Sequence, residues 1–196
     1  GSPGPGIHSS SGGSLQGYDW HFHNNSEQGL FIDSATVVVD GLTTADNGHS
    51  GAHIFDARYI TLSNFTSTND GSLGSNAMEQ AGLSYQKSND LETTSGDVAC
   101  MNCHIEASQG HGVYVIDSVD LWLDQLSITG IDASLPAMYV DNGGLTLGTQ
   151  GGRFNLLNAN IEHESSTQYA LYIEQAAGNI DGLTLQGNHS GIYWDA

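Results

Sequence analysis

The amino-acid sequence predicts an all-β protein in which short parallel strands stack in register. The 196 residues include 26 glycines and many Ser, Thr and Asn, and short apolar runs separate them. This composition is typical of strands joined by many turns. No stretch shows a convincing helical period. Two short motifs also recur along the chain, and internal repeats of this kind are the signature of stacked architectures.

The first motif is a turn inside a strand. It has four positions: an apolar residue, any residue, then Gly, Asn or Gln, and a second apolar residue. Gly and Asn tolerate the left-handed αL backbone, so this motif predicts a sharp turn with both apolar side chains inside. Gln125 is the exception, because Gln has no special tolerance of αL. The seven segments are Leu15–Tyr18, Val39–Leu42, Leu62–Phe65, Cys100–Cys103, Leu123–Leu126, Leu156–Ala159 and Ile180–Leu183.

The second motif precedes each turn: a small residue begins a strand whose second and fourth positions are apolar. These strands begin at residues 6, 29, 51, 82, 112, 137, 170 and 191. The two motifs together predict a right-handed, single-stranded parallel β-helix over residues 6–196, with about seven coils of 21–33 residues. Residues 1–5 are expected to be a linker or a cloning remnant, and the β-helix a fragment of a longer chain.

This order of strand, loop, strand and αL turn resembles the pectin-lyase-like superfamily, which includes pectate lyases, polygalacturonases and phage tailspikes. The resemblance is greatest to the rod of a phage or virus tailspike. It implies a homotrimer at the virion surface or in another extracellular setting. Gly110-His111-Gly112 resembles the Gly-His-Gly element of polygalacturonases, but the other elements of that site are absent, and the word is expected to be a turn. Neither Arg58 nor Arg153 lies where pectate lyases place their arginine.

The charge of the chain excludes one class of partner. The net charge is −19, and only Arg58, Lys87 and Arg153 are positive. Nucleic acids and anionic membranes attract clustered Lys and Arg, so neither is an expected partner. No apolar run approaches the roughly 20 residues that span a bilayer, so membrane insertion is not expected.

Cys100 and Cys103 have the C-x-x-C spacing of redox pairs and zinc sites. No second pair accompanies them, and both occupy the apolar positions of a turn motif. We therefore expect them to be core residues with a packing role.

Outward side chains of stacked strands form rows, because equivalent residues in neighbouring strands lie about 4.8 Å apart. The second strands present Trp122 among smaller residues, to be explained by subunit packing or by cover from a loop. His21 and His23 share an outward face. The remaining predicted rows are Val38, Thr61, Ala99, Asn155 and Asn179 beside Trp122, and Asp19, Thr43, Thr66, His104, Ser127, Asn160 and Thr184 on the third strands.

The first strands carry the candidate binding site. Tyrosines have flat apolar faces with a polar tip, which suits sugars, and carboxylates accept hydrogen bonds from sugar hydroxyls. Ordinary cross-strand stacking and a subunit interface are the alternatives. Loops 86–97 and 141–153 are expected to wall a groove beside these residues. The outward row reads His8, Phe31, His53, Ser84, Tyr114, Tyr139, Tyr172 and Tyr193, with Asp33, Phe55, Gln86, Ile116, Asp141, Glu174 and Asp195 in the next.

Three neighbouring carboxylates, Asp141, Glu174 and Asp195, end the second row. Like charges this close favour either uptake of a proton or binding of a cation such as Ca²⁺. Glycoside hydrolysis uses one protonated and one ionised carboxyl group. Glu174 is the candidate acid, with Asp141 or Asp195 as its partner, and chance clustering of acidic residues is the alternative. No other cofactor is expected.

The functional expectation is a tailspike-type domain that recognises, and in one version hydrolyses, a host-surface polysaccharide. Two alternatives stay open. One is a non-catalytic structural or adhesive trimeric spike whose tyrosine row is the subunit interface. The other is a secreted polysaccharide lyase or hydrolase of the pectinase type, which the acidic surface disfavours because polyuronates are anionic.

Overall fold

The computed structural model describes residues 2–10, 13–57, 59–86, 96–116, 119–141 and 153–195. It is all-β with parallel sheets, an architecture compatible with a β-helix. The elements are β1 (Ile7–Ser9), β2 (Ser14–His23), β3 (Leu30–Asp33), β4 (Thr36–Ala45), β5 (Ala52–Phe55), β6 (Tyr59–Thr68), α1 (Ala77–Gln80), β7 (Leu83–Gln86), β8 (Gly96–Glu106), β9 (Val113–Ile116), β10 (Val119–Thr129), β11 (Met138–Asp141), β12 (Arg153–Leu157), β13 (Asn160–Glu162), β14 (Leu171–Glu174), β15 (Ala177–Asp181), β16 (Thr184–Gln186) and β17 (Ile192–Asp195).

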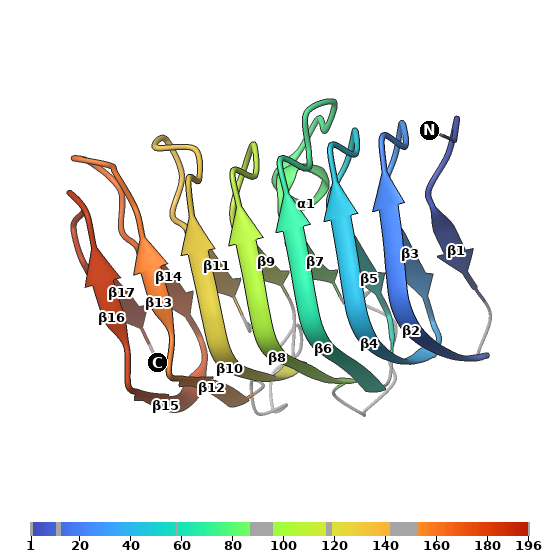
Figure 1. Ribbon diagram of the computed structural model, residues 1–196. Coiled ribbons are helices and arrows are strands. Elements are labelled where there is room, and N and C mark those ends of the chain that lie inside the picture. Colours follow the sequence, from blue (N-terminus) through green and yellow to red (C-terminus); the bar gives the residue numbers. More distant parts are fainter. Residues whose placement is uncertain are drawn as a thin grey trace.

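The strands form two parallel sheets that follow chain order (Figure 1). One sheet has eight short strands in the order β1-β3-β5-β7-β9-β11-β14-β17. The other has nine, in the order β15-β12-β10-β8-β6-β4-β2, with β13 paired to β10 and β16. Each short strand therefore pairs with the preceding and following short strands, and the long strands do the same. This alternation produces the predicted rows of equivalent side chains.

The predicted αL turns explain why the long strands bend. Six of the seven predicted residues have positive φ. Gln125, the one residue type without a special tolerance of αL, is among them, with φ 55°. The first prediction was wrong, because Asp19 rather than Gly17 turns β2, with φ 53°. Gly17 instead lies opposite Val39, where the indole of Trp20 leaves no room for a Cβ atom. The five other confirmed positions are Gly41, Asn64, Asn102, Asn158 and Gly182.

The shifted first turn also changes one outward row. His21, not Asp19, pairs with Thr43 and heads the third-strand row. Two further sets of αL residues lie at the ends of strands and were not predicted. Ser34, Asp56 and Gln175 follow the short strands, and Asn24, Asp46, Asn69, Ala107 and Gly130 follow the long ones.

The core lies between the sheets and is a continuous apolar cluster. Leu62, Leu123 and Leu156 are fully buried within it. Leu183, which its turn motif placed inside, and Leu185 pack against this cluster but stay partly exposed. Cys100 and Cys103 are buried as predicted. They are joined by a disulfide, however, so their role is more than packing.

The described helix is limited to the four residues of α1, whose N-cap Asn76 accepts a hydrogen bond from the Glu79 backbone N–H. Among the described residues, no helix is long and apolar enough to cross a membrane.

Candidate functional site

The four candidate tyrosines lie in one row on the eight-stranded sheet. Tyr114 on β9 pairs with Tyr139 on β11, which pairs with Tyr172 on β14, which pairs with Tyr193 on β17. In β9, β11 and β14 buried and partly exposed residues alternate, so the apolar neighbours on either side of Tyr114, Tyr139 and Tyr172 anchor these strands in the core. In β17 the neighbours of Tyr193, Ile192 and Trp194, are exposed. Period-two alternation and parallel register therefore place the four phenol rings side by side.

The rings stack face to face. Their centroids are 5.2 Å apart for Tyr114–Tyr139, 5.2 Å for Tyr139–Tyr172 and 4.6 Å for Tyr172–Tyr193, with interplanar angles of 15°, 4° and 13°. Each inner ring thus has its faces covered by its neighbours. The row presents ring edges and hydroxyl groups outward instead of the flat faces that sequence reasoning assigned to sugar binding.

The tyrosines are also less exposed than the alternation predicted. All four are partly buried. The imidazole of His111 stacks on Tyr114 with centroids 5.1 Å apart, and the ring of Tyr169 lies 5.6 Å from that of Tyr193. Both residues come from the segments that lead into short strands, so tertiary contacts cover both ends of the row.

His111 belongs to this site, although sequence reasoning assigned it to a turn. It is buried, and its Nδ1 lies 2.6 Å from the carbonyl oxygen of Pro136. Because a carbonyl only accepts, Nδ1 carries a proton and donates it. Burial lowers the pKa of His111 from 6.5 to about 4, so the ring is neutral at pH 7. The tripeptide Gly110-His111-Gly112 was recognised in the sequence, but the contact of the His111 ring with Tyr114 was not predicted.

The phenol groups of Tyr139 and Tyr172 remain protonated at neutral pH. Burial, followed by the charge of Asp141, raises the pKa of Tyr139 to about 12. Desolvation, followed by the charge of Glu174, raises the pKa of Tyr172, whose hydroxyl also hydrogen-bonds Glu174. The row therefore offers O–H groups that both donate and accept.

The candidate carboxylates form the adjacent row. Asp141 pairs with Glu174, and Glu174 pairs with Asp195. Asp141 and Glu174 are partly exposed, and Asp195 is exposed. Neighbouring parallel strands lie about 4.8 Å apart, so the three carboxyl groups line up beside the phenols.

The row that contains the tyrosines continues toward the N-terminus with stacked rings. The rings of His8 and Phe31 lie 4.6 Å apart, and those of Phe31 and His53 lie 5.3 Å apart. His53 Nδ1 is 2.8 Å from Ser84 Oγ. Burial lowers the pKa of His53 to about 4. Ser84 is fully buried, so this His–Ser pair has no access for a substrate and is structural.

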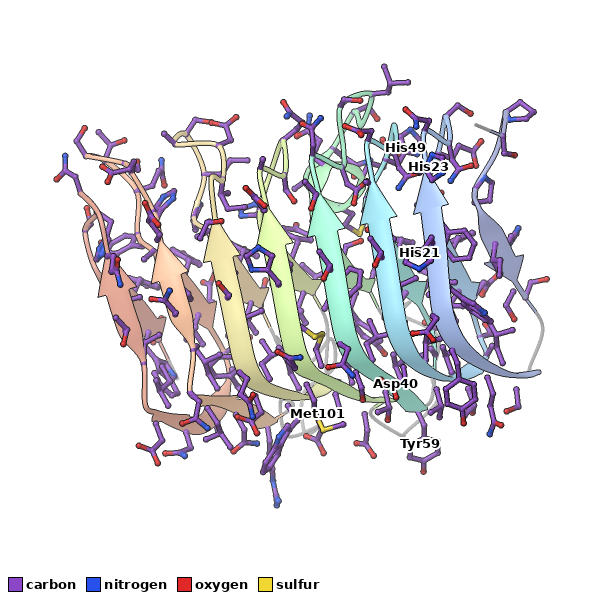
Figure 2. The ribbon with its side chains drawn as sticks, in the orientation of Figure 1. His21, His23, Asp40, His49, Tyr59 and Met101 are labelled. Atoms are coloured by element: carbon purple, nitrogen blue, oxygen red, sulfur yellow. A yellow bond between two sulfur atoms is a disulfide. The ribbon has the colours of Figure 1, made fainter. Side chains whose placement is uncertain are left out.

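Most of the predicted groove walls, loops 86–97 and 141–153, lies outside the described residues, as does Arg58. His21 and His23 are both exposed on β2, and Figure 2 shows them along one strand. Within the described segments, no group of three or more His, Cys, Asp or Glu side chains is arranged to hold a metal ion.

Comparison with known proteins finds no relative of this chain. No protein-family model, curated protein or solved structure matches the chain. The site is therefore interpreted from its own residues.

Proposed function

We propose that the chain is a right-handed, single-stranded parallel β-helix of the pectin-lyase-like kind, nearest to a tailspike rod, that binds a linear polysaccharide. The observation that carries the binding proposal is the in-register pair of rows, four phenol hydroxyls beside three carboxylates. The strand order supports the fold proposal. In each of the two sheets, a strand pairs with the strands that precede and follow it in that sheet along the chain.

The ligand is a polyhydroxylated chain because of what the two rows offer. Phenol hydroxyls donate and accept, and carboxylates accept, which matches successive sugar hydroxyls. The hydrogen bonds recur with each strand along the stacking direction, so an extended ligand gains more contacts than a compact one. Three carboxylates and a net charge of −19 repel polyuronates, so the glycan is neutral or cationic.

Hydrolysis is a further part of the proposal. Glu174 would act as the acid, and Asp141 or Asp195 as the partner carboxylate. Carboxyl groups on neighbouring strands are about 5 Å apart, and this separation favours the retaining mechanism.

The trimeric spike is the second candidate function. The tyrosine row supports it, because tyrosine is enriched at subunit interfaces. A homotrimer that buried this row would bring the Asp141, Glu174 and Asp195 carboxylates of its subunits together. It would have to neutralise these carboxylates or keep them apart.

The test uses a variant that keeps the stack. Tyr139→Phe combined with Tyr172→Phe removes two hydroxyls and leaves both rings. We expect this variant to bind a matching polysaccharide at least about tenfold more weakly, since each hydrogen bond contributes about 1 kcal/mol. Tyr59→Phe, which removes an exposed hydroxyl on β6, is the matched control. The assay is affinity electrophoresis against neutral, cationic and anionic polysaccharides.

Three outcomes are informative. Unchanged binding by the double Phe variant contradicts the hydroxyl row as the site. Shortened glycan products that disappear in Glu174→Gln would identify a hydrolase. Loss of an oligomer in Tyr139→Ala, with no glycan bound by the wild-type protein, would instead establish the interface.

A further inference from the structure

A second surface, on the nine-stranded sheet, gathers exposed apolar side chains. We call it the Trp122 face. It is formed by the outward residues of the first halves of the long strands, before their αL turns. Figure 2 shows Tyr59 and Met101 at the lower edge of the sheet. Its exposed large side chains are Tyr18 (74%), Tyr59 (61%), Trp122 (46%), Val38 (44%) and Met101 (40%).

These five make up most of the large apolar side chains exposed in the described part of the chain; the others are Leu73, Ile192 and Trp194. The sequence had indicated Trp122 alone. The register explains the grouping: Trp122 pairs with Ala99, whose small side chain leaves the indole uncovered on that side. Apolar side chains gathered on one exposed face mark contact sites for another molecule, whereas single exposed ones are ordinary.

Carboxylates are interleaved with these apolar groups. Asp120 and Asp124 lie two residues before and after Trp122 on β10, on the same outward side. Asp97 pairs directly with Asp120, which sets like charges opposite each other. Partial desolvation, together with the charge of Asp120, raises the pKa of Asp97. Arg153 follows Asp120 in the same row and donates its backbone N–H to that carboxylate, and Asn158 donates to Asp124. Among the described residues of this face, three carboxylates therefore stand against one guanidinium, and the face stays acidic.

The spacing suits a guanidinium group. Residues two apart on a strand lie about 6.6 Å from each other, so carboxylates flank the indole on both sides. Arginine stacks its planar fork on an aromatic face and bonds carboxylates at its edge, which lysine does less well. Met101 and Val38 add apolar surface for the aliphatic parts of a peptide.

A second copy of this chain is a poor occupant. Each copy carries −19, and two such faces in contact would set Asp97, Asp120 and Asp124 against further carboxylates. Juxtaposed like charges cost several kcal/mol at an interface. We propose that the Trp122 face docks an arginine-containing basic segment of a partner protein. This proposal is independent of the polysaccharide site.

The experiment titrates the intact chain with a fluorescent Arg-Gly repeat peptide at physiological ionic strength, using fluorescence anisotropy. A Lys-Gly repeat of equal charge is the first control. We expect the arginine peptide to bind more tightly. Trp122→Ala should lower its affinity about tenfold, a factor that corresponds to 1.4 kcal/mol and lies within the range of a cation–π contact.

A charge-matched pair of variants separates this site from general attraction to an acidic protein. Asp97→Asn with Asp120→Asn should weaken binding and flatten its salt dependence. Glu106→Gln with Glu162→Gln removes the same charge from exposed residues of the third-strand rows and should have a much smaller effect. Circular dichroism checks that every variant keeps its fold.

Several results would overturn the proposal. Equal affinity for the two peptides with no effect of Trp122→Ala, or equal losses in the two charge variants, would show non-specific polycation binding. No measurable binding would also contradict it. A wild-type oligomer that Trp122→Ala dissociates would show that a second copy covers the face.

Discussion

Acidification should destabilise the fold through its buried histidines, and two of the three that the structure describes, His53 and His111, carry the largest shifts in pKa. Burial lowers both pKa values from 6.5 to about 4. An unfolded chain binds a proton near pH 6.5, whereas the folded chain resists it until about pH 4. Their stabilising contribution is therefore fully present above pH 6.5 and is lost as the pH falls toward 4.

The magnitude follows from proton linkage. By pH 4.5 each histidine should remove about 2.5 kcal/mol from the free energy of unfolding. This is a large part of the roughly 5–15 kcal/mol that stabilises a typical domain. Burial raises the pKa of Asp70, and this opposes the loss, because the folded chain then takes up that proton first. The loss of stability measured on the wild-type protein alone is therefore smaller than the loss that the histidines cause.

A difference between variants isolates one histidine. Urea unfolding is followed by circular dichroism between pH 7.5 and 4.5 for the wild-type protein and for His111→Gln. His111→Gln lowers stability at pH 7.5, since the Pro136 hydrogen bond and the stack on Tyr114 are lost. Its stability should then fall by about 2.5 kcal/mol less than that of the wild-type protein on acidification.

The control is His21→Gln, which removes an exposed imidazole on β2. If His111→Gln loses as much stability between pH 7.5 and 4.5 as the wild-type protein does, the buried imidazole is not the source of the pH dependence. The reasoning from burial would then be refuted.

Three further predictions concern the fold. Gln125→Gly should raise the free energy of unfolding by about 0.5–1 kcal/mol in urea melts, because Gln125 has φ 55° and glycine adopts that conformation without strain; a decrease would contradict the αL assignment. Leu123→Ala should cost about 2–5 kcal/mol by the same measurement, since Leu123 is fully buried, and a cost below about 1 kcal/mol would argue against a packed core there. Unfolding without reductant should expose no free thiol to a thiol reagent, whereas prior reduction should expose both; free thiols without reductant would disprove the Cys100–Cys103 disulfide.

Several features of the site depend on contacts between distant segments. His111 covers Tyr114 and donates to Pro136, which lies 25 residues further along the chain. The register of the tyrosine row was predicted, and its face-to-face stacking was one of the alternatives to sugar binding that the sequence left open. That stacking changes the chemistry that the row offers, from ring faces to hydroxyl groups.

Local sequence rules are enough to predict the rows and most of the turns. Alternation of period two fixes which side chains share a face, and αL backbone needs particular residues, so Gly41, Asn64 and Asn102 were readable locally. Tertiary structure decided what local rules leave open. The first turn lies at Asp19 because Trp20, which pairs with Leu42, packs against the core, whereas Tyr18 is exposed. Which apolar residue enters the core depends on the register with the neighbouring strand, which alternation along one strand does not encode.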